Sequence, residues 1–317
     1  AKPPGSPANR AAAVHSDKAL LAFQRDLVSV LAPRADALPL LGAALLARPL
    51  VNPPKTSSFH VLIDRATQAD GDDAAVSWVR LADCDQKAAA CPNAAALDQL
   101  LTQAPDNAAV WLLKLGVDTR DMKPDAARED LAKAAAAKSY DDYLGTSLKA
   151  LASSVGVLPP PAEVLASANA AGAAGIQAVL VYGLASTQPQ PSLPVTAKLC
   201  ENAGADASIK TDCLKLAKVL EWGSSPLARS LGLHLREVLA DDPAQQEDAR
   251  HSRISLIWQV QSFAQLAARA QGDKVMAAHL VALARNGGTE MSVLLAALRD
   301  NQIPTDAPAG WTPQQAR

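Results

Sequence analysis

Aromatic residues and an excess of charge of either sign are scarce in this sequence. Aromatics make up 3% of its 317 residues, and 30 basic side chains nearly balance 32 acidic ones, which leaves a formal net charge of −2. A nucleic-acid-binding domain carries a basic patch for the phosphates, and single-strand binders add aromatic side chains on which bases stack. The composition therefore predicts no nucleic-acid partner.

Long apolar runs are also missing. A membrane-spanning helix needs about 20 consecutive, mainly apolar residues, and the most apolar stretch, residues 162–185, is interrupted by Glu163, Asn169 and Gln177. We therefore expect no transmembrane segment. The sequence opens Ala-Lys-Pro-Pro-Gly, which is typical of a mature N-terminus after removal of an export signal. Whether a lipid-bearing cysteine preceded it stays open.

Familiar catalytic motifs do not occur. Gly-x-Ser-x-Gly and Ser-x-x-Lys are absent, as are His-Glu-x-x-His, the P-loop and Gly-x-Gly-x-x-Gly. Helical cell-wall lytic enzymes are expected to have a catalytic glutamate followed directly by a serine. No glutamate of this sequence is followed directly by serine. The five histidines lie far apart in sequence, and we interpret each as a packing or surface residue. We predict no catalytic residue, no metal site and no cofactor, although residues distant in sequence can still converge in the fold.

Alanine and leucine, both strong helix formers, dominate what is present. Strand-favouring residues do not alternate along the chain, and most prolines lie at segment edges, where they start or stop helices. The sequence predicts an all-α protein, an array of antiparallel helix pairs like an α-α superhelix or solenoid. The first helix is expected from Ser16 to Leu31.

Proline-rich breaks divide the array. We expect residues 1–15 to be disordered, residues 16–158 to form an N-terminal helical region, and residues 159–302 to form a C-terminal one. The run Pro159–Pro161 is the predicted boundary between them. Residues 303–317 are expected to form an irregular tail.

One helix pair has a family pattern. A proline at 105 precedes Trp111, and Ala127, Leu131 and Ala134 follow the tryptophan at spacings of sixteen, four and three residues. The segment Pro105–Ala134 resembles a tetratricopeptide or Sel1-like repeat. The family's tyrosine near the end of the first helix is replaced by Asp118, its Leu-Gly pair falls one residue late, and its closing proline is Ser139. The resemblance implies a protein-binding scaffold.

The four cysteines form two local pairs. Cys84 and Cys91 are seven residues apart, and Cys200 and Cys213 are thirteen apart. Neither spacing matches a zinc or Cys-x-x-Cys redox motif, although four buried free thiols stay an alternative. We predict disulfides Cys84–Cys91 and Cys200–Cys213, each clipping a helical hairpin and contributing about 2.5 and about 3 kcal/mol at most.

Disulfides place the chain in an oxidising compartment. The alanine-, leucine- and arginine-rich usage is typical of a high-GC bacterium, so we expect the periplasm.

Two short clusters are candidate partner-binding sites. The acidic surroundings of Tyr140, Asp141, Asp142 and Tyr143 favour exposure, although helix capping by the aspartates explains them equally well. A basic cluster, Arg250, His251 and Arg253, follows acidic residues, and local pairing on a solvated helix face is its simpler interpretation. The tryptophans at 78, 111, 222 and 258 fall on apolar helix faces, where we expect mainly core packing.

Two functions remain. The first is a non-enzymatic periplasmic scaffold that binds another protein, in its most specific form an immunity or inhibitor protein that neutralises a toxin or hydrolase. The alternative is a periplasmic cell-wall or lipid hydrolase with a non-standard site.

Overall fold

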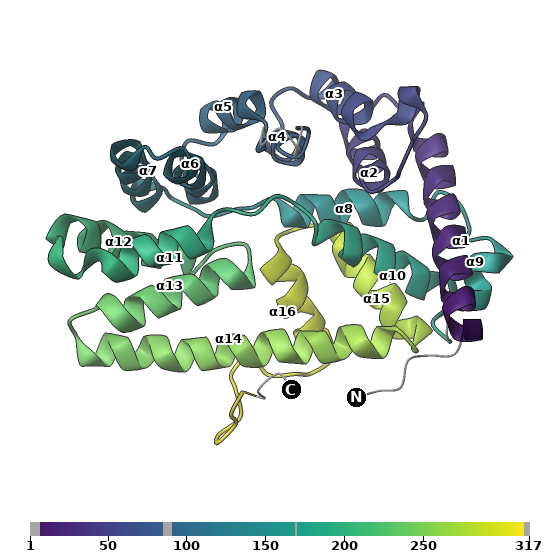
Figure 1. Ribbon diagram of the computed structural model, residues 1–317. Coiled ribbons are helices and arrows are strands. Elements are labelled where there is room, and N and C mark those ends of the chain that lie inside the picture. Colours follow the sequence, from purple (N-terminus) through teal and green to yellow (C-terminus); the bar gives the residue numbers. More distant parts are fainter. Residues whose placement is uncertain (1–6, 85–90, 169, 314–317) are drawn as a thin grey trace. The chain divides into compact units, whose positions relative to one another are not determined.

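The computed structural model describes residues 7–84, 91–168 and 170–313, and side chains over 17–84, 91–168, 170–203 and 206–313. Within these ranges the chain forms sixteen α-helices, two short 3₁₀ helices and no strand (Figure 1). The predicted all-α class, with paired helices and two disulfide-clipped hairpins, is confirmed.

The helices group into two compact units. Unit 1 comprises residues 1–71, 147–187 and 267–286, and unit 2 comprises residues 72–146, 188–266 and 287–317. The predicted division at Pro159–Pro161 therefore differs from the structure, because residues on both sides of it belong to unit 1. Each unit draws helices from both halves of the sequence, since helices far apart along the chain pack together.

Unit 1 is built around a helix that is apolar on nearly every side. It contains α1 (Pro7–Leu31), α2 (Ala37–Ala47), η1 (Lys55–Ser57), α3 (Phe59–Ala69), α9 (Ala162–Ser167), α10 (Gly172–Ala185) and α15 (Lys274–Asn286). Because α1 and α3 both pack on α2, eight of its eleven residues are buried. α1 begins at Pro7, so residues 7–15 are helical and not disordered as predicted; residues 1–6 lie outside the described residues.

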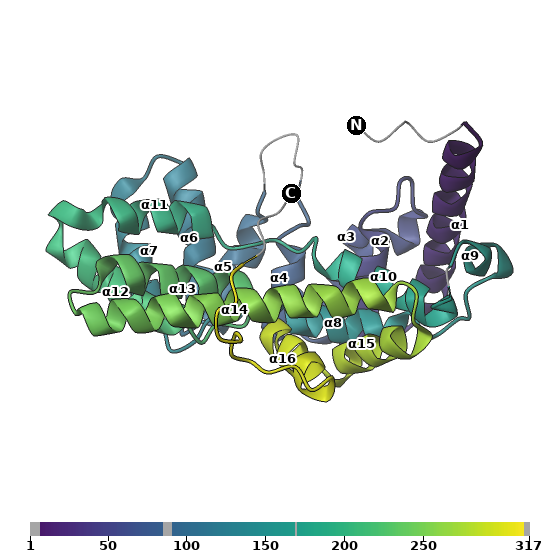
Figure 2. The same cartoon turned by 90° about the horizontal axis from the view of Figure 1, so that it is seen from below.

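Unit 2 holds most of the paired helices. It contains α4 (Ala74–Arg80), α5 (Ala94–Gln103), α6 (Ala108–Arg120), α7 (Pro124–Ala136), α11 (Leu193–Glu201), η2 (Asn202–Ala205), α12 (Ala207–Leu220), α13 (Pro226–Leu239) and α16 (Glu290–Asp300). α8 (Leu144–Ser154) and α14 (Pro243–Ala270) contribute residues to both units. Figure 2 shows α12 and α13 side by side, and α12 also packs against α7.

The pair α6–α7 covers the segment that resembles a tetratricopeptide repeat. Ala127, Leu131 and Ala134 are buried between the two helices. The structure shows the helix pair, and membership of the repeat family stays a prediction.

An ionic contact explains the most conspicuous departure from the repeat pattern. Asp118, at the family's tyrosine position, is buried and pairs with Lys114, which also lies 3.6 Å from Asp130 on α7. Burial raises the pKa of Asp130 to about 6. Burial also acts to raise the pKa of Asp118, but the hydrogen bond from Lys114 holds that pKa below its ordinary value. A buried ion pair thus joins the helices where an aromatic ring would otherwise pack.

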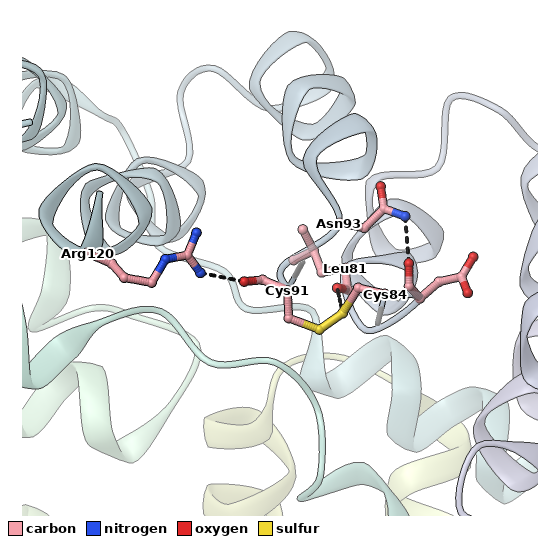
Figure 3. Close-up of a disulfide and its surroundings, with 6 residues drawn as sticks. Leu81, Cys84, Cys91, Asn93 and Arg120 are labelled. Carbon is pink, nitrogen blue, oxygen red and sulfur yellow. Dashed lines mark hydrogen bonds between the residues drawn. A yellow bond between two sulfur atoms is a disulfide. The ribbon is translucent and has the colours of Figure 1, made fainter. Parts of the chain in front are cut away.

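Both predicted disulfides are present. The Cα atoms of Cys84 and Cys91 are 5.3 Å apart, and those of Cys200 and Cys213 are 5.7 Å apart. Around the first pair, Arg120 donates to the carbonyl of Cys91, and Asn93 Nδ2 donates to the carbonyl of Asp83 at 2.7 Å (Figure 3). The second pair joins α11 to α12. Both disulfides fit an oxidising compartment.

Candidate binding groove around Trp222

The clearest exposed feature of unit 2 is the tryptophan that follows α12. The buried stripe of α12 runs through Cys213, Leu216 and Leu220. With 3.6 residues per turn, a residue two positions beyond Leu220 points roughly away from that stripe. Trp222 is accordingly 81% exposed, and the expectation that it packs in the core is wrong. Leu227, at the start of α13, is 65% exposed.

Trp222 borders a groove with a volume of about 340 Å³. Its walls come from the end of α12, from α13 and α14, and from the segment after α16. The other lining residues are Glu221, Arg229, Leu233, Arg236, Asp248, His251, Ser252, Ser255, Leu256, Gln259 and Asp306. The groove therefore combines one large exposed ring with many polar and charged groups.

An arginine joins two of the carboxylates in the groove. Arg236 Nε lies 2.9 Å from Glu221 Oε1, and its Nη2 lies 2.8 Å from Asp248 Oδ2. Burial raises the pKa of Glu221, although the charge of Arg236 opposes this shift. Arg236 therefore has its charge fully compensated, because it pairs with both acids.

A second arginine in the groove has no such partner. Arg229 is half-buried, and its Nε donates to the carbonyl of Gly223 at 2.8 Å. No carboxylate in the described part of the chain forms an ion pair with it. Burial lowers its pKa, but a guanidinium stays charged in proteins. Arg229 therefore places an uncompensated positive charge beside the exposed ring of Trp222.

Backbone and side-chain hydrogen bonds hold the turn that carries Trp222. Ser224 N donates to the carbonyl of Tyr140 at 3.0 Å, and Met291 N donates to the carbonyl of Ser224 at 2.9 Å. Ser224 Oγ donates to Asp142 Oδ1 at 3.0 Å. Ser225 then caps α13, because its Oγ accepts from Ala228 N. The tryptophan thus extends into solvent from a turn whose next three residues are buried.

Acidic groups gather behind this turn. Asp142 is 1% exposed, and its Oδ2 accepts no hydrogen bond from the described residues. Burial and the nearby charge of Asp142 raise the pKa of Glu290 to about 7. Burial also raises the pKa of Asp142, against the effect of its hydrogen bond from Leu144. The support of the Trp222 turn therefore contains a carboxyl group that titrates near neutral pH.

The candidate segment from Tyr140 to Tyr143 is part of this support and not an exposed surface. Tyr140 and Asp142 are buried, and Asp141 and Tyr143 are half-buried, so the expected exposure is wrong. Asp141 Oδ1 accepts from Tyr143 N, and Asp142 Oδ1 accepts from Leu144 N. The acidic residues are turned inward because they accept hydrogen bonds from the backbone of their own turn.

The basic cluster of α14 is divided. Arg250 pairs with Glu247 three residues earlier, which is the local pairing expected as the simpler interpretation. Arg253 pairs instead with Glu237 on α13. His251 is exposed and lines the Trp222 groove. The structure brings this one residue of the predicted clusters to the groove.

The main groove residues were not selected from the sequence. Trp222 follows the end of α12, whereas Arg229 and Arg236 lie in the first and last turns of α13. One signal was available, because continuing the period of α12 past Leu220 moves Trp222 off the buried stripe.

Comparisons with protein-family models, curated proteins and solved structures find no match to this chain. Among the described residues, no group of three or more His, Cys, Asp or Glu side chains is arranged to hold a metal ion. Every described helix is too short or too polar to cross a bilayer.

Proposed function

We propose that the chain is a protein-binding scaffold and that the groove around Trp222 is its contact surface. The observation that carries this proposal is the 81% exposure of Trp222 on a turn fixed by buried hydrogen bonds. Because the backbone of the turn is already fixed, a partner that covers the ring has only the side chain of Trp222 to order.

The chemistry of the groove favours a protein partner. Tryptophan and arginine are enriched among the residues that dominate binding energy at protein interfaces. Trp222 and Arg229 lie in one groove, with Leu227 exposed on the same helix connection. A partner that inserts an apolar side chain against Trp222 and presents a carboxylate to Arg229 matches both groups.

The proposed setting is the bacterial periplasm, which the two disulfides support because they need an oxidising compartment. The partner class that fits this setting is a toxin or hydrolase that acts in the periplasm. The chain would then be its immunity or inhibitor protein.

The test uses the full, oxidised chain immobilised and incubated with a periplasmic extract of the producing bacterium. A captured protein is identified, purified and titrated against three versions of the chain: wild type, Trp222→Ala and Val275→Ala. Val275 is 79% exposed on α15 and does not line the groove, so its truncation is the matched control.

We expect Trp222→Ala to weaken binding about 30-fold or more, as truncation of a dominant interface residue does. Val275→Ala should bind like the wild type. Equal affinities for wild type and Trp222→Ala would contradict the proposed contact surface.

A further inference from the structure

A second groove lies at the other end of α12. It has a volume of about 590 Å³, within the range of small-molecule sites. Residues of the α6–α7 turn, of α7, of α11 and of the first turn of α12 line it. None of them lines the Trp222 groove, so this site is independent of the proposed protein contact.

The wall formed by α11 and α12 is apolar and fixed. Val195 and Leu199 on α11 and Ile209 on α12 are half-buried. The disulfide Cys200–Cys213 joins these two helices, and both cysteines are fully buried. Because packing places α11 and α12 and the disulfide ties them together, the apolar wall exists before any ligand binds.

A methionine borders the groove in an unusual backbone conformation. Met122 has φ of 58°, in the left-handed region where glycine normally ends a helix. Lys123 N donates to the carbonyl of Asp118 at 2.8 Å, which closes the helix end. The side chain of Met122 is 87% exposed. Methionine is flexible and polarisable, so it adapts to an apolar ligand.

Three cations surround the apolar wall, and they differ in how they are compensated. Arg128 Nη1 lies 2.7 Å from Asp212 Oδ2, and Lys123 Nζ lies 3.7 Å from Asp118 Oδ1. Lys198 is exposed and forms no ion pair in the described part of the chain.

The only carboxylate among the lining residues, Asp206, caps α12 by accepting from Ser208 N and Ile209 N. Lys198 is therefore the lining cation that no carboxylate of the described residues pairs, and Asp206 is directed to the N-terminus of α12.

We propose that this groove binds a monomeric anionic amphiphile, a single alkyl chain that ends in an acidic head group. The alkyl chain would lie along Val195, Leu199 and Ile209, with Met122 closing over it. The head group would pair with Lys198, because Lys123 already lies near Asp118 and Asp121. Charge complementarity selects an anion over a neutral or cationic amphiphile of equal chain length.

The experiment titrates the full, oxidised chain by calorimetry with dodecanoate, below its micelle-forming concentration. Dodecyl maltoside and dodecyltrimethylammonium are the matched ligands, because they keep the alkyl chain and change the head group. Anionic phosphatidylglycerol vesicles form a separate arm. We expect one saturable dodecanoate site, with affinity about fivefold higher than for the maltoside, the factor that a favourable exposed ion pair supplies.

Two surface variants locate the site. Lys198→Glu should weaken dodecanoate binding about tenfold, while the control Lys215→Glu, on an exposed part of α12 outside the groove, should not. Met122→Gly keeps a residue that suits the left-handed backbone and removes the side chain, so it should weaken binding without unfolding the turn. Circular dichroism confirms that each variant is folded.

Three results would overturn the proposal. One is equal binding of the three amphiphiles, which would show unselective hydrophobic adsorption. Another is unchanged dodecanoate affinity in Lys198→Glu. The third is binding to vesicles alone, which would assign the basic residues to a membrane surface.

Discussion

α12 presents a different surface at each of its ends. At its C-terminal end an exposed ring, Trp222, stands beside a polar groove in which Arg236 pairs with two carboxylates. At its N-terminal end the surface is an apolar hollow with the unpaired Lys198 at its edge. A protruding ring suits insertion into a partner, whereas a hollow suits a ligand, and we therefore propose two kinds of recognition on one helix.

The two ends are also held by different means. The N-terminal half of α12 is tied covalently to α11, because Cys213 near the middle of the helix bonds to Cys200. The C-terminal end is held by close packing on α13 and by the hydrogen bonds of Ser224. The first device resists unfolding independently of pH, while the second lies beside Glu290, whose pKa is raised to about 7 by burial and by the charge of Asp142.

The largest expected effect comes from a substitution that disrupts the packing of α12 on α13. A Cβ on Gly232 would lie 2.6 Å from Glu221 N and 2.7 Å from the carbonyl oxygen of Ala217. Both are backbone atoms, so α12 and α13 must separate. Gly232→Ala should lower the free energy of unfolding by about 3 kcal/mol, at the upper end of overpacking costs, as measured by urea denaturation. An unchanged transition midpoint would show that the contact relaxes freely.

The next largest effect comes from removal of the disulfide that ties α12 to α11. The double variant Cys200→Ser with Cys213→Ser should lose up to about 3 kcal/mol, because the loop is no longer closed in the unfolded chain. Helix content should change little, since packing and not the disulfide specifies α11 and α12. Urea denaturation and circular dichroism measure the two quantities. A large loss of helix in the folded baseline would mean that the disulfide specifies the fold.

A pH experiment distinguishes the two ends of α12 by the pH dependence of their stability. The pKa of Glu290 is raised from 4.5 to about 7, so the folded protein binds this proton more tightly than the unfolded chain. The wild type should therefore lose stability as the pH rises from about 4.5 to about 7. Glu290→Gln removes this loss and should be more stable than wild type by about 3 kcal/mol at alkaline pH, since one pKa unit corresponds to about 1.4 kcal/mol.

Urea denaturation at acidic and alkaline pH measures this difference. Glu129→Gln, on an exposed position of α7, is the control and should follow the wild type. Parallel profiles for wild type and Glu290→Gln would show that ionised Glu290 is already well solvated.

The smallest effect concerns Met122. Glycine adopts the left-handed conformation without the steric cost that methionine bears. Met122→Gly should therefore raise the free energy of unfolding by about 1 kcal/mol, measured by urea denaturation. A destabilised variant would show that the exposed side chain makes contacts that outweigh the backbone strain.

Local features of the fold could be predicted, and long-range ones could not. Helices and both cysteine pairings follow from short-range periodicity and spacing. The division into two discontinuous units does not, because it depends on packing between helices from both halves of the chain. The burial of Tyr140 and Asp142 could not be predicted either, because their hydrogen-bond partner Ser224 is distant in sequence. The prediction that Trp222 packs in the core is wrong because it assumes that an apolar residue just after a helix lies on the buried face of that helix.

The central claim is that a protein partner covers Trp222. The most direct measurement replaces Trp222 with the photoreactive p-benzoylphenylalanine and compares it with the same replacement at Val275, another exposed apolar position. Irradiation in periplasmic extract should give a discrete crosslinked protein from position 222 and none from position 275. Crosslinking from position 275 alone, or equally from both, would contradict the account.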